Sequence, residues 1–271
     1  MPELPEVETT RRGLAVHLVG QRIADVVVRD RRLRWPVPKG LRARLVGATI
    51  QSIARRGKYL LFDCGRGHLL AHLGMSGSLR MVPAGTPADK HDHFDLLLEN
   101  AWAMRLTDPR RFGAILWLGK NPERHPLLAQ LGIEPLGDEL TGEWLFTSTR
   151  KAKVAIKLWL MDSHRITGIG NIYANEAMFR AGVRPTRRAG TVTRKQCELL
   201  APAIRHTLCQ AIEAGGSTLR NFVGSDGNPG YFQHQYMVYG RAGEPCRVCG
   251  TPIRTVRQVN RATYYCPVCQ R

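Results

Sequence analysis

Four cysteines near the C-terminus have the residue type and spacing of a metal site. Cys246, Cys249, Cys266 and Cys269 form two Cys-x-x-Cys pairs with sixteen residues between them. Each pair can direct two thiolates at one cation, and two pairs complete the tetrahedral shell of zinc. Four thiolates leave no position for a catalytic water, so we expect one structural Zn²⁺. Disulfides are the alternative, but they are rare in a reducing cytoplasm, where we expect this chain to work.

The N-terminal stretch PELPEVET gathers prolines and acids in a basic chain. Proline fits the first turn of a helix, and acids favour the positive end of the helix dipole. This pattern predicts a helix opened by Pro5, Glu6 and Glu8. It does not account for Pro2 and Glu3, which we expect to lie before that helix.

A third motif, ITGIGNIY, has the residue types of an anion-binding turn. Gly168 and Gly170 permit a tight turn, and Asn171, an N-cap residue type, stands where the next helix should begin. Backbone N–H groups at such a turn can bind phosphate. An ordinary turn between helices would have the same sequence, so the motif alone leaves both interpretations open.

The charge of the chain indicates a polyanionic partner. Its 271 residues carry a net charge of +18, and between Arg150 and Lys195 eleven basic residues face two acids. Such an imbalance favours a surface that follows a nucleic-acid backbone. No apolar run approaches the roughly 20 residues of a membrane span. We therefore expect nucleic acid, and no membrane, as the partner.

The elements that position these motifs change type along the chain. Short β-branched and apolar runs separated by turn residues predict a β-sandwich or barrel in the first half. Helical periodicity follows in the second half. The expected strands are 22–29, 58–64, 68–74, 93–99, 102–107 and 112–118, and the expected helices after them are 154–161, 171–181 and 193–214.

The cysteine pairs enclose TPIRTVRQVNRATYY, which predicts two strands around a turn near Val259–Arg261. Arg261 would then lie at the tip of a hairpin held by the metal. Either zinc only stabilises a small terminal unit, or it presents Arg261 to the nucleic acid. The isolated Cys64, Cys197 and Cys209 are expected to be small buried apolar residues.

Taken together, PELPEVET, DPRRFG, GIGNIYANEA and the cysteine module resemble the formamidopyrimidine-DNA glycosylase family. The motifs occur in the family's order over nearly the whole chain. Endonuclease VIII enzymes are siblings with similar fold and chemistry, but they usually carry glycine where this chain has Leu4. The resemblance therefore favours the branch that acts on purines.

The resemblance implies a two-domain α+β fold with DNA in the cleft between the domains. We expect an N-terminal β-sandwich with flanking helices at 1–125, a helix–two-turn–helix domain at 126–236, and a four-cysteine zinc finger at 237–271. It also implies a monomer in the bacterial cytoplasm, associated with the nucleoid. Besides the structural zinc, we expect no catalytic metal or organic cofactor.

The implied activity is base-excision repair. Members of the family remove 8-oxoguanine and formamidopyrimidines from double-stranded DNA, and they cleave abasic sites by β,δ-elimination through a Schiff base. By the resemblance, the amine of Pro2 is the nucleophile once Met1 is removed. Glu3 is the general acid/base, Lys58 serves β-elimination, and Arg261 serves phosphate binding and δ-elimination.

The same resemblance assigns residues that contact DNA and the lesion. Those expected to contact DNA are His72, His91, Arg110, Lys153, Asn171 and Tyr239. Those expected to fill the space left by the extruded base are Met75, Arg110 and Phe112. Those expected to recognise the lesion are Glu6, Lys157, Ser217, Thr218, Leu219 and Arg220.

Two other functions stay open. One keeps the chemistry but prefers oxidised pyrimidines, as endonuclease VIII does. The other is a zinc-finger DNA-binding protein without catalysis, against which the presence of both Pro2 and Glu3 argues.

Overall fold

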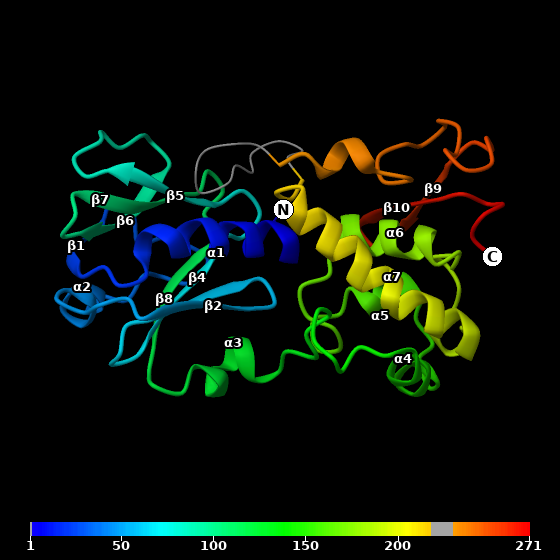
Figure 1. The fold of residues 1–271 in the computed structure, drawn as a ribbon, viewed down its shortest axis with the longest axis horizontal. Helices are drawn as coiled ribbons and strands as arrows, with labels where there is room; N and C mark the ends of the chain where they lie inside the picture. Colours follow the sequence, from blue (N-terminus) through cyan, green and yellow to red (C-terminus); the bar gives the residue numbers. More distant parts are fainter. Residues whose placement is uncertain (1, 218–229) are drawn as a thin grey trace. The chain divides into compact units, whose positions relative to one another are not determined.

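The computed structural model describes residues 2–217 and 230–271, which belong to two compact units (Figure 1). Unit 1 comprises Met1–Ala129 and Ala214–Tyr231, and unit 2 comprises Gln130–Glu213 and Phe232–Arg271. Among the described helices of both units, none is long and apolar enough to cross a membrane.

Unit 1 contains two four-stranded sheets in which every neighbouring pair of strands is antiparallel. The first sheet has the order β1 (Ile23–Val28), β6 (Asp92–Leu98), β7 (Trp102–Thr107), β5 (Ser78–Pro83). The second has the order β2 (Ser52–Arg56), β3 (Tyr59–Asp63), β4 (His68–His72), β8 (Ala114–Leu118). The short helices of this unit are α2 (Leu41–Leu45), η1 (Pro122–Arg124) and α3 (Pro126–Ala129).

Helix α1 (Leu4–Leu18) joins the two sheets, because it contacts β2 and β3 of one and β5 of the other (Figure 1). Its buried Leu14 and Leu18 belong to one apolar core with Phe62 and Phe94. Burying such side chains stabilises the fold by about 1.5–3 kcal/mol each. The sequence therefore predicted a sandwich with flanking helices correctly, although it missed two strands. Strand β2 carries Arg55 and Arg56, and strand β5 carries Arg80 and ends in Pro83.

Unit 2 packs helices against a C-terminal β-hairpin. Helix α6 (Asn171–Arg180) contacts α5 (Ile156–Leu160), α7 (Arg194–Glu213) and the hairpin strand β10 (Arg261–Tyr265), while α4 (Gly142–Thr149) packs on α7. Strand β9 (Arg254–Gln258) pairs with β10. The remaining short elements are η2 (Ala189–Thr191) and η3 (Phe232–Gln235).

The ends of α7 follow their sequence signals. Thr193 accepts from the backbone N–H of Gln196, and the Gln196 side chain accepts from the backbone N–H of Thr193, which makes the expected capping box. The helix ends at Glu213 before two glycines, Gly215 and Gly216, at φ +74° and +82°. The expected helix was thus right within a residue at each end.

Helix α6 begins at Asn171, as expected, with Gly170 as the N-cap, so the asparagine side chain is available for another contact. The expectation for one cysteine was wrong. Cys209 is exposed, whereas Cys64 and Cys197 are buried as expected. Cys209 lies on α7 outside the buried face of that helix. The expectation treated the cysteine by its residue type alone and did not place it on the face of the helix.

The Glu8 carboxylate, on α1, lies at the centre of a cluster of ion pairs in unit 1. It accepts from Arg11, Arg12 and Arg55, at 2.8, 2.9 and 3.2 Å. Arg55 also donates to the carbonyl of Gly57, at 3.0 Å, and so ties α1 to the turn before β3. Burial raises the pKa of Glu8, but the hydrogen bonds from Arg11 and Arg12 outweigh it and hold the pKa below its usual value.

We predict that Glu8→Gln lowers the free energy of unfolding by about 2 kcal/mol, because Arg55 would keep a nearly buried charge without its carboxylate. The loss should be measured by urea unfolding near neutral pH. Since the pKa of Glu8 is lowered in the folded state, its contribution is present above the unfolded pKa and disappears as the pH falls through the folded pKa.

Glu99→Gln is the matched control for this prediction. Glu99 forms an exposed ion pair with Arg22, at 3.5 Å, and such pairs contribute about 0–1 kcal/mol. Equal stability of the Glu8→Gln and Glu99→Gln proteins would contradict the role given to Glu8.

Candidate nucleic-acid interface and metal centre

Pro2 and Glu3 lie at the N-terminal end of α1, and both are buried. Glu3 is the N-cap of α1 and forms a capping box with Glu6: the Glu3 carboxylate accepts from the Glu6 backbone, and Glu6 accepts from the Glu3 backbone N–H, at 2.8 Å. Pro2 and Glu3 thus lie before the first helical residue, Leu4, as expected, and Glu3 has the additional role of N-cap. Its carboxylate is oriented by the same cap that fixes its backbone.

The second oxygen of Glu6 holds another segment of unit 1. It accepts from the backbone N–H of Ser217, at 2.8 Å. Gly216 lies so close that a Cβ there would stand 3.1 Å from the Glu6 side chain, and its φ of +82° also favours glycine. The Glu6 carboxylate, 2% exposed, therefore fixes both Glu3 and Ser217. The other predicted lesion-contacting residues of this segment, Thr218, Leu219 and Arg220, lie outside the described residues.

Lys58 and His72 lie close to each other at one end of the central strands β3 and β4 of the second sheet. Lys58 follows the turn at Gly57, and Tyr59 pairs in register with His72, their rings 4.8 Å apart. Burial, together with the positive charges of Lys58 and Arg34, lowers the pKa of His72 to about 4. The backbone N–H of Gly74 donates to Nδ1, at 3.1 Å. His72 is thus neutral at pH 7 and carries its proton on Nε2.

The three predicted void-filling residues occupy two neighbouring loops of unit 1. Met75 and Phe112 expose 38% and 42% of their surface, which is unusual for large apolar side chains. The Arg110 guanidinium lies over the Phe112 ring, 4.8 Å from its centroid. The cation and the aromatic ring therefore form one exposed wedge. His91, the remaining DNA-contact candidate of this unit, is half-buried, with its ring 6.4 Å from that of His93.

In unit 2, Lys157 and Asn171 hold the strand that begins with Arg261. Lys157 is fully buried, and its Nζ donates to the carbonyl of Ala262 and the hydroxyl of Thr263, at 2.9 and 2.7 Å. Asn171 Nδ2 donates to the same Ala262 carbonyl, at 3.1 Å. Arg261 itself is exposed as the first residue of β10. Both side chains therefore fix the backbone next to an exposed cation.

The two other DNA-contact candidates of unit 2 differ in their surroundings. Tyr239 donates its backbone N–H to Glu176, at 2.8 Å, and its ring lies 5.2 Å from that of Tyr264. Its ring is thereby held against the hairpin. Lys153 is exposed between α4 and α5. The exposure of Lys153 suits a backbone phosphate contact, which needs charge more than fixed geometry.

The four cysteine sulfurs converge as the sequence predicted. They all lie within 4.8 Å of one another, with Cys246 and Cys269 sulfurs 3.9 Å apart and Cys249 and Cys266 sulfurs 3.5 Å apart. Zinc–sulfur bonds of about 2.3 Å in a tetrahedron place sulfurs roughly 3.8 Å apart. The residues therefore fit zinc, with all four positions taken by the protein.

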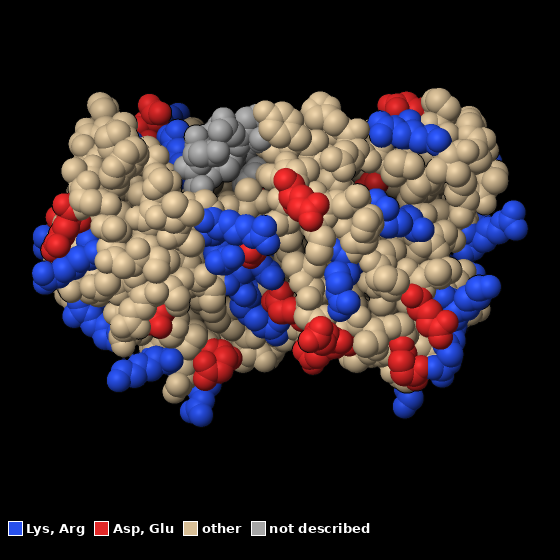
Figure 2. Space-filling view, viewed as in Figure 1, with Lys and Arg blue, Asp and Glu red and all other residues tan. Residues whose placement is uncertain are grey.

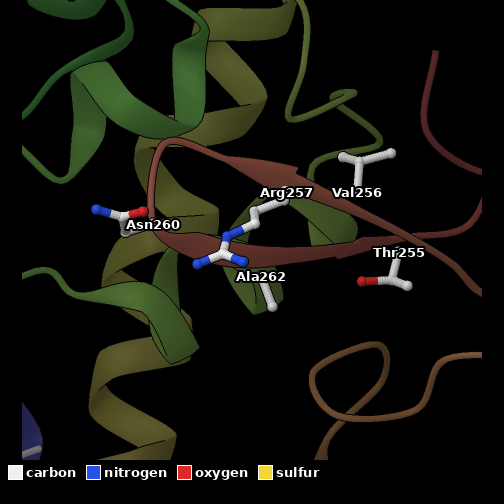
Figure 3. Close-up of a pocket in the computed structure, with 5 residues that line it drawn as sticks. All are labelled: Thr255, Val256, Arg257, Asn260 and Ala262. Carbon is white, nitrogen blue, oxygen red and sulfur yellow. The ribbon is translucent and has the colours of Figure 1, made fainter.

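The outer face of the hairpin contains a hollow of about 320 Å³ that the sequence did not indicate. Its lining includes Arg257 and Asn260, and Figure 3 shows the Arg257 guanidinium near Ala262, with Asn260 at the turn. Arg257 pairs with Ala262 in register, so both project from the same face. The alternation of strand residues was the signal that could have placed Arg257 there.

The basic surplus is not gathered on the face drawn in Figure 2, where Lys and Arg side chains are interspersed with Asp and Glu. The structure also contains exposed ion pairs, for example Arg42 with Asp25 and Arg165 with Asp162. Such pairs neutralise charge locally. Net charge alone therefore does not locate the binding surface. The surface has to be located from the positions of individual side chains.

We predict that Cys249→Ser removes most of the bound zinc, because a hydroxyl is a much poorer zinc ligand than a thiolate. Zinc per chain, measured by atomic emission, should be near one for the unmodified protein and far below one for the variant. Cys209→Ser is the control, since Cys209 is exposed on α7 and lies outside the cluster. Equal zinc in all three proteins would contradict a four-thiolate site.

We predict that His72 titrates near pH 4 and keeps its proton on Nε2 above that pH. The unfolded chain binds this proton near pH 6.5, so the folded state loses stability relative to the unfolded state as the pH falls from about 6.5 towards about 4. Nitrogen–proton NMR of the imidazole gives the pKa and the tautomer directly. The His72→Gln protein should show a weaker loss of stability over this range. Titration near 6.5 would contradict the assignment.

Three family models match the chain in order. The N-terminal domain of formamidopyrimidine-DNA glycosylase matches residues 1–115, its H2TH domain residues 131–223, and a zinc finger found in FPG and IleRS residues 243–271. Curated formamidopyrimidine-DNA glycosylases from Thioalkalivibrio sulfidiphilus and Pseudomonas entomophila are each 56% identical over 271 residues, covering 100% of both chains.

Solved structures agree with these matches. The Fpg (MutM) protein of Thermus thermophilus is 40% identical, with a TM-score of 0.88 over 99% of this chain and 98% of that chain. A Lactococcus lactis Fpg mutant in complex with DNA containing Fapy-dG is 33% identical, with a TM-score of 0.92 over 100% of both chains. The N-terminal sandwich, the helical unit and the four-cysteine hairpin have their counterparts in these relatives, and the chain belongs to the formamidopyrimidine-DNA glycosylase family.

Proposed function

We propose that this chain removes oxidised purines from double-stranded DNA and cleaves the strand at the resulting abasic site, with the amine of Pro2 as nucleophile. The observation that carries the proposal is the fixed, buried N-terminus of α1, where Pro2 adjoins the capped Glu3 and Glu6 holds the Glu3 backbone. A nucleophile at a chain end needs such fixation, because termini are otherwise poorly ordered.

An N-terminal amine suits this chemistry because of its protonation. The reference pKa of lysine is about 10.4 and that of an α-amine about 7.7–8.0, so at pH 7 roughly 10–20% of the α-amine is unprotonated, against a few hundredths of a per cent of lysine. A secondary amine can still form an iminium with a sugar aldehyde. That iminium is the electron sink for elimination.

The proposed sequence of steps begins when the Pro2 nitrogen lone pair forms a bond to the sugar C1′ and the damaged base leaves with the glycosidic electron pair. The C1′–O4′ bond then breaks, O4′ takes a proton, and the opened sugar is joined to Pro2 as an iminium. Glu3 would move protons at this sugar, and the cap of α1, in which its carboxylate accepts from the Glu6 backbone, supports this role by orienting it. Loss of the C2′ proton expels the 3′ phosphate, which is β-elimination. Loss of the C4′ proton then expels the 5′ phosphate, which is δ-elimination. Hydrolysis of the remaining iminium frees the amine of Pro2.

The remaining residues are proposed to hold DNA in this position. In unit 1, Lys58 and the neutral His72 would bind phosphate beside the site, with His91 a further contact and the Met75, Arg110 and Phe112 wedge in the duplex. In unit 2, Lys153, Asn171, Tyr239 and Arg261 would bind the backbone. Lys157 supports this role through the hairpin contacts that fix Ala262, rather than through an exposed charge of its own.

The surroundings of the lesion are proposed from Glu6 and Ser217. Glu6 fixes the Ser217 backbone and so sets where the following segment begins, including Thr218, Leu219 and Arg220 outside the described residues. The structural zinc would keep Arg261 on a rigid hairpin. The bacterial relatives support a site of action in the bacterial cytoplasm, and we propose that the substrate there is nucleoid DNA.

We predict that borohydride traps a covalent adduct between the protein and an 8-oxoguanine duplex when Met1 has been removed. A short N-terminal extension before Pro2 should abolish trapping, because Pro2 nitrogen then becomes an amide without nucleophilic character. Zinc content and DNA affinity should change little. Intact-mass measurement of the protein verifies each N-terminus.

Comparison of substrates completes this test. Faster release of 8-oxoguanine than of thymine glycol supports the purine assignment, and the reverse order would assign the chain to pyrimidine repair. Full trapping by the extended protein would refute Pro2 as the nucleophile. A protein that binds both duplexes with no cleavage and no adduct would be a DNA-binding protein without catalysis.

A further inference from the structure

Asp108 lies at the junction of the two loops that carry the wedge, although it is not itself expected to contact DNA. The Met75 loop, residues 73–77, connects β4 to β5, and the Phe112 loop, residues 108–113, connects β7 to β8. Strand β4 pairs with β8 and β5 pairs with β7. Both loops therefore pass from one sheet to the other at the same edge of the sandwich.

The Asp108 side chain is fully buried and binds both loops. One oxygen accepts from the Ser76 hydroxyl, at 2.8 Å, and from the Arg110 backbone N–H, at 3.3 Å. The other accepts from the backbone N–H of Gly113, at 2.8 Å. Each of the three donors is next to a wedge residue or belongs to one. A single carboxylate thus fixes the backbone on both sides of the wedge.

Two glycines let the loops touch backbone to backbone. A Cβ on Gly74 would stand 2.4 Å from the Phe112 carbonyl carbon, and one on Gly113 would stand 2.7 Å from the carbonyl oxygen of His72. Neither position has room for a side chain. The spacing of Met75 and Phe112 is therefore determined by close packing as well as by Asp108.

The Asp108 backbone fixes the base of the same junction. Its N–H donates to the carbonyl of His91, at 2.9 Å, and its carbonyl lies 2.9 Å from His93 Nε2. The Phe112 loop is thereby attached to β6 as well as to the Met75 loop. Thermal motion of either loop relative to the other would have to break several of these bonds together.

A wedge that replaces an extruded base must be rigid to be useful. Extruding a base costs a few kcal/mol of stacking and pairing, and the inserted side chains offset that cost only if they are already ordered. Exposed side chains on flexible loops would instead lose conformational entropy on insertion. The contacts around Asp108 remove that loss in advance.

We infer that Asp108 is a positioning residue for base extrusion: its carboxylate, through Ser76, Arg110 and Gly113, presets Met75, Arg110 and Phe112 as one rigid wedge. This inference rests on the proposed function, because it assumes that these three side chains enter the duplex. It assigns to Asp108 an effect on the step that takes a base out of the helix, and little effect on elimination at a site where no base remains.

The test compares two single-turnover rates in the same protein: release of 8-oxoguanine opposite cytosine, and cleavage of a preformed abasic site. Asp108→Asn replaces one accepting oxygen by an amide N–H₂, which cannot accept a hydrogen bond from its backbone N–H partner. Ser76→Ala removes the hydroxyl through which Asp108 binds the Met75 loop. We expect Asp108→Asn to lower base release about tenfold or more relative to abasic-site cleavage. Ser76→Ala should shift the same ratio in the same direction by about threefold.

Matched controls separate positioning from a general loss of stability. Asp92→Asn changes a buried acid on β6 that accepts from Arg105 and Thr107. Ser78→Ala changes a buried serine two positions beyond Ser76. Both should leave the ratio of the two rates unchanged, even where both rates fall. A 2-aminopurine beside the lesion should also lose its fluorescence rise on binding in Asp108→Asn, as the neighbouring step stays stacked.

The outcomes distinguish this inference from the proposed function. Unmodified protein that cleaves neither substrate refutes the proposed function. If it cleaves both, and every folded Asp108 and Ser76 variant keeps the original ratio, the positioning role of Asp108 is overturned. If Asp108→Asn does not fold, Ser76→Ala decides alone, because it retains the carboxylate and its two backbone contacts.

Discussion

The proposed chemistry at Pro2 depends on the Glu6 carboxylate, because Glu6 fixes the backbone of Glu3, the residue next to Pro2. Glu6 uses one oxygen for the Glu3 backbone N–H and the other for the Ser217 backbone N–H, 211 residues away in sequence. The acid is almost completely buried, so each bond forms in a low dielectric and is stronger than in water. An amine placed in this way can react with a sugar carbon without first being ordered by the substrate.

The same device recurs wherever a functional residue needs a fixed backbone. Asp108 accepts backbone N–H groups of Arg110 and Gly113 from one wedge loop and the Ser76 hydroxyl from the other. Glu176 accepts three successive backbone N–H groups, from Met237, Val238 and Tyr239. Burial raises the pKa of Glu176, and the three backbone hydrogen bonds oppose that rise. A buried acid without such partners would be strongly destabilising, so its donors must be backbone groups already in position. Fixing the backbone also fixes where the neighbouring side chains begin.

The sequence predicted the parts of this molecule whose signals are local. The cysteine spacing located the metal centre, and alternation and helical periodicity located most strands and helices. Strand β5 was missed because Pro83 ends it and Arg80 interrupts its apolar pattern. Glu3 was correctly placed before α1, but its capping role was not predicted, because a glutamate N-cap is less usual than a serine or aspartate. The bond between Glu6 and Ser217, and the convergence of Ser76, Arg110 and Gly113 on Asp108, are long-range contacts that no local pattern records.

Lys157 shows why residue type alone does not determine a role. A lysine in a basic segment suggests contact with phosphate, yet this one is fully buried and donates to Ala262 and Thr263 of the hairpin. An ammonium has three donors and no acceptor, so it can hold a carbonyl and a hydroxyl at once. Together with Asn171 it fixes the strand immediately after Arg261. The buried cation thus positions the backbone next to Arg261, and it is the exposed Arg261 whose charge faces solvent.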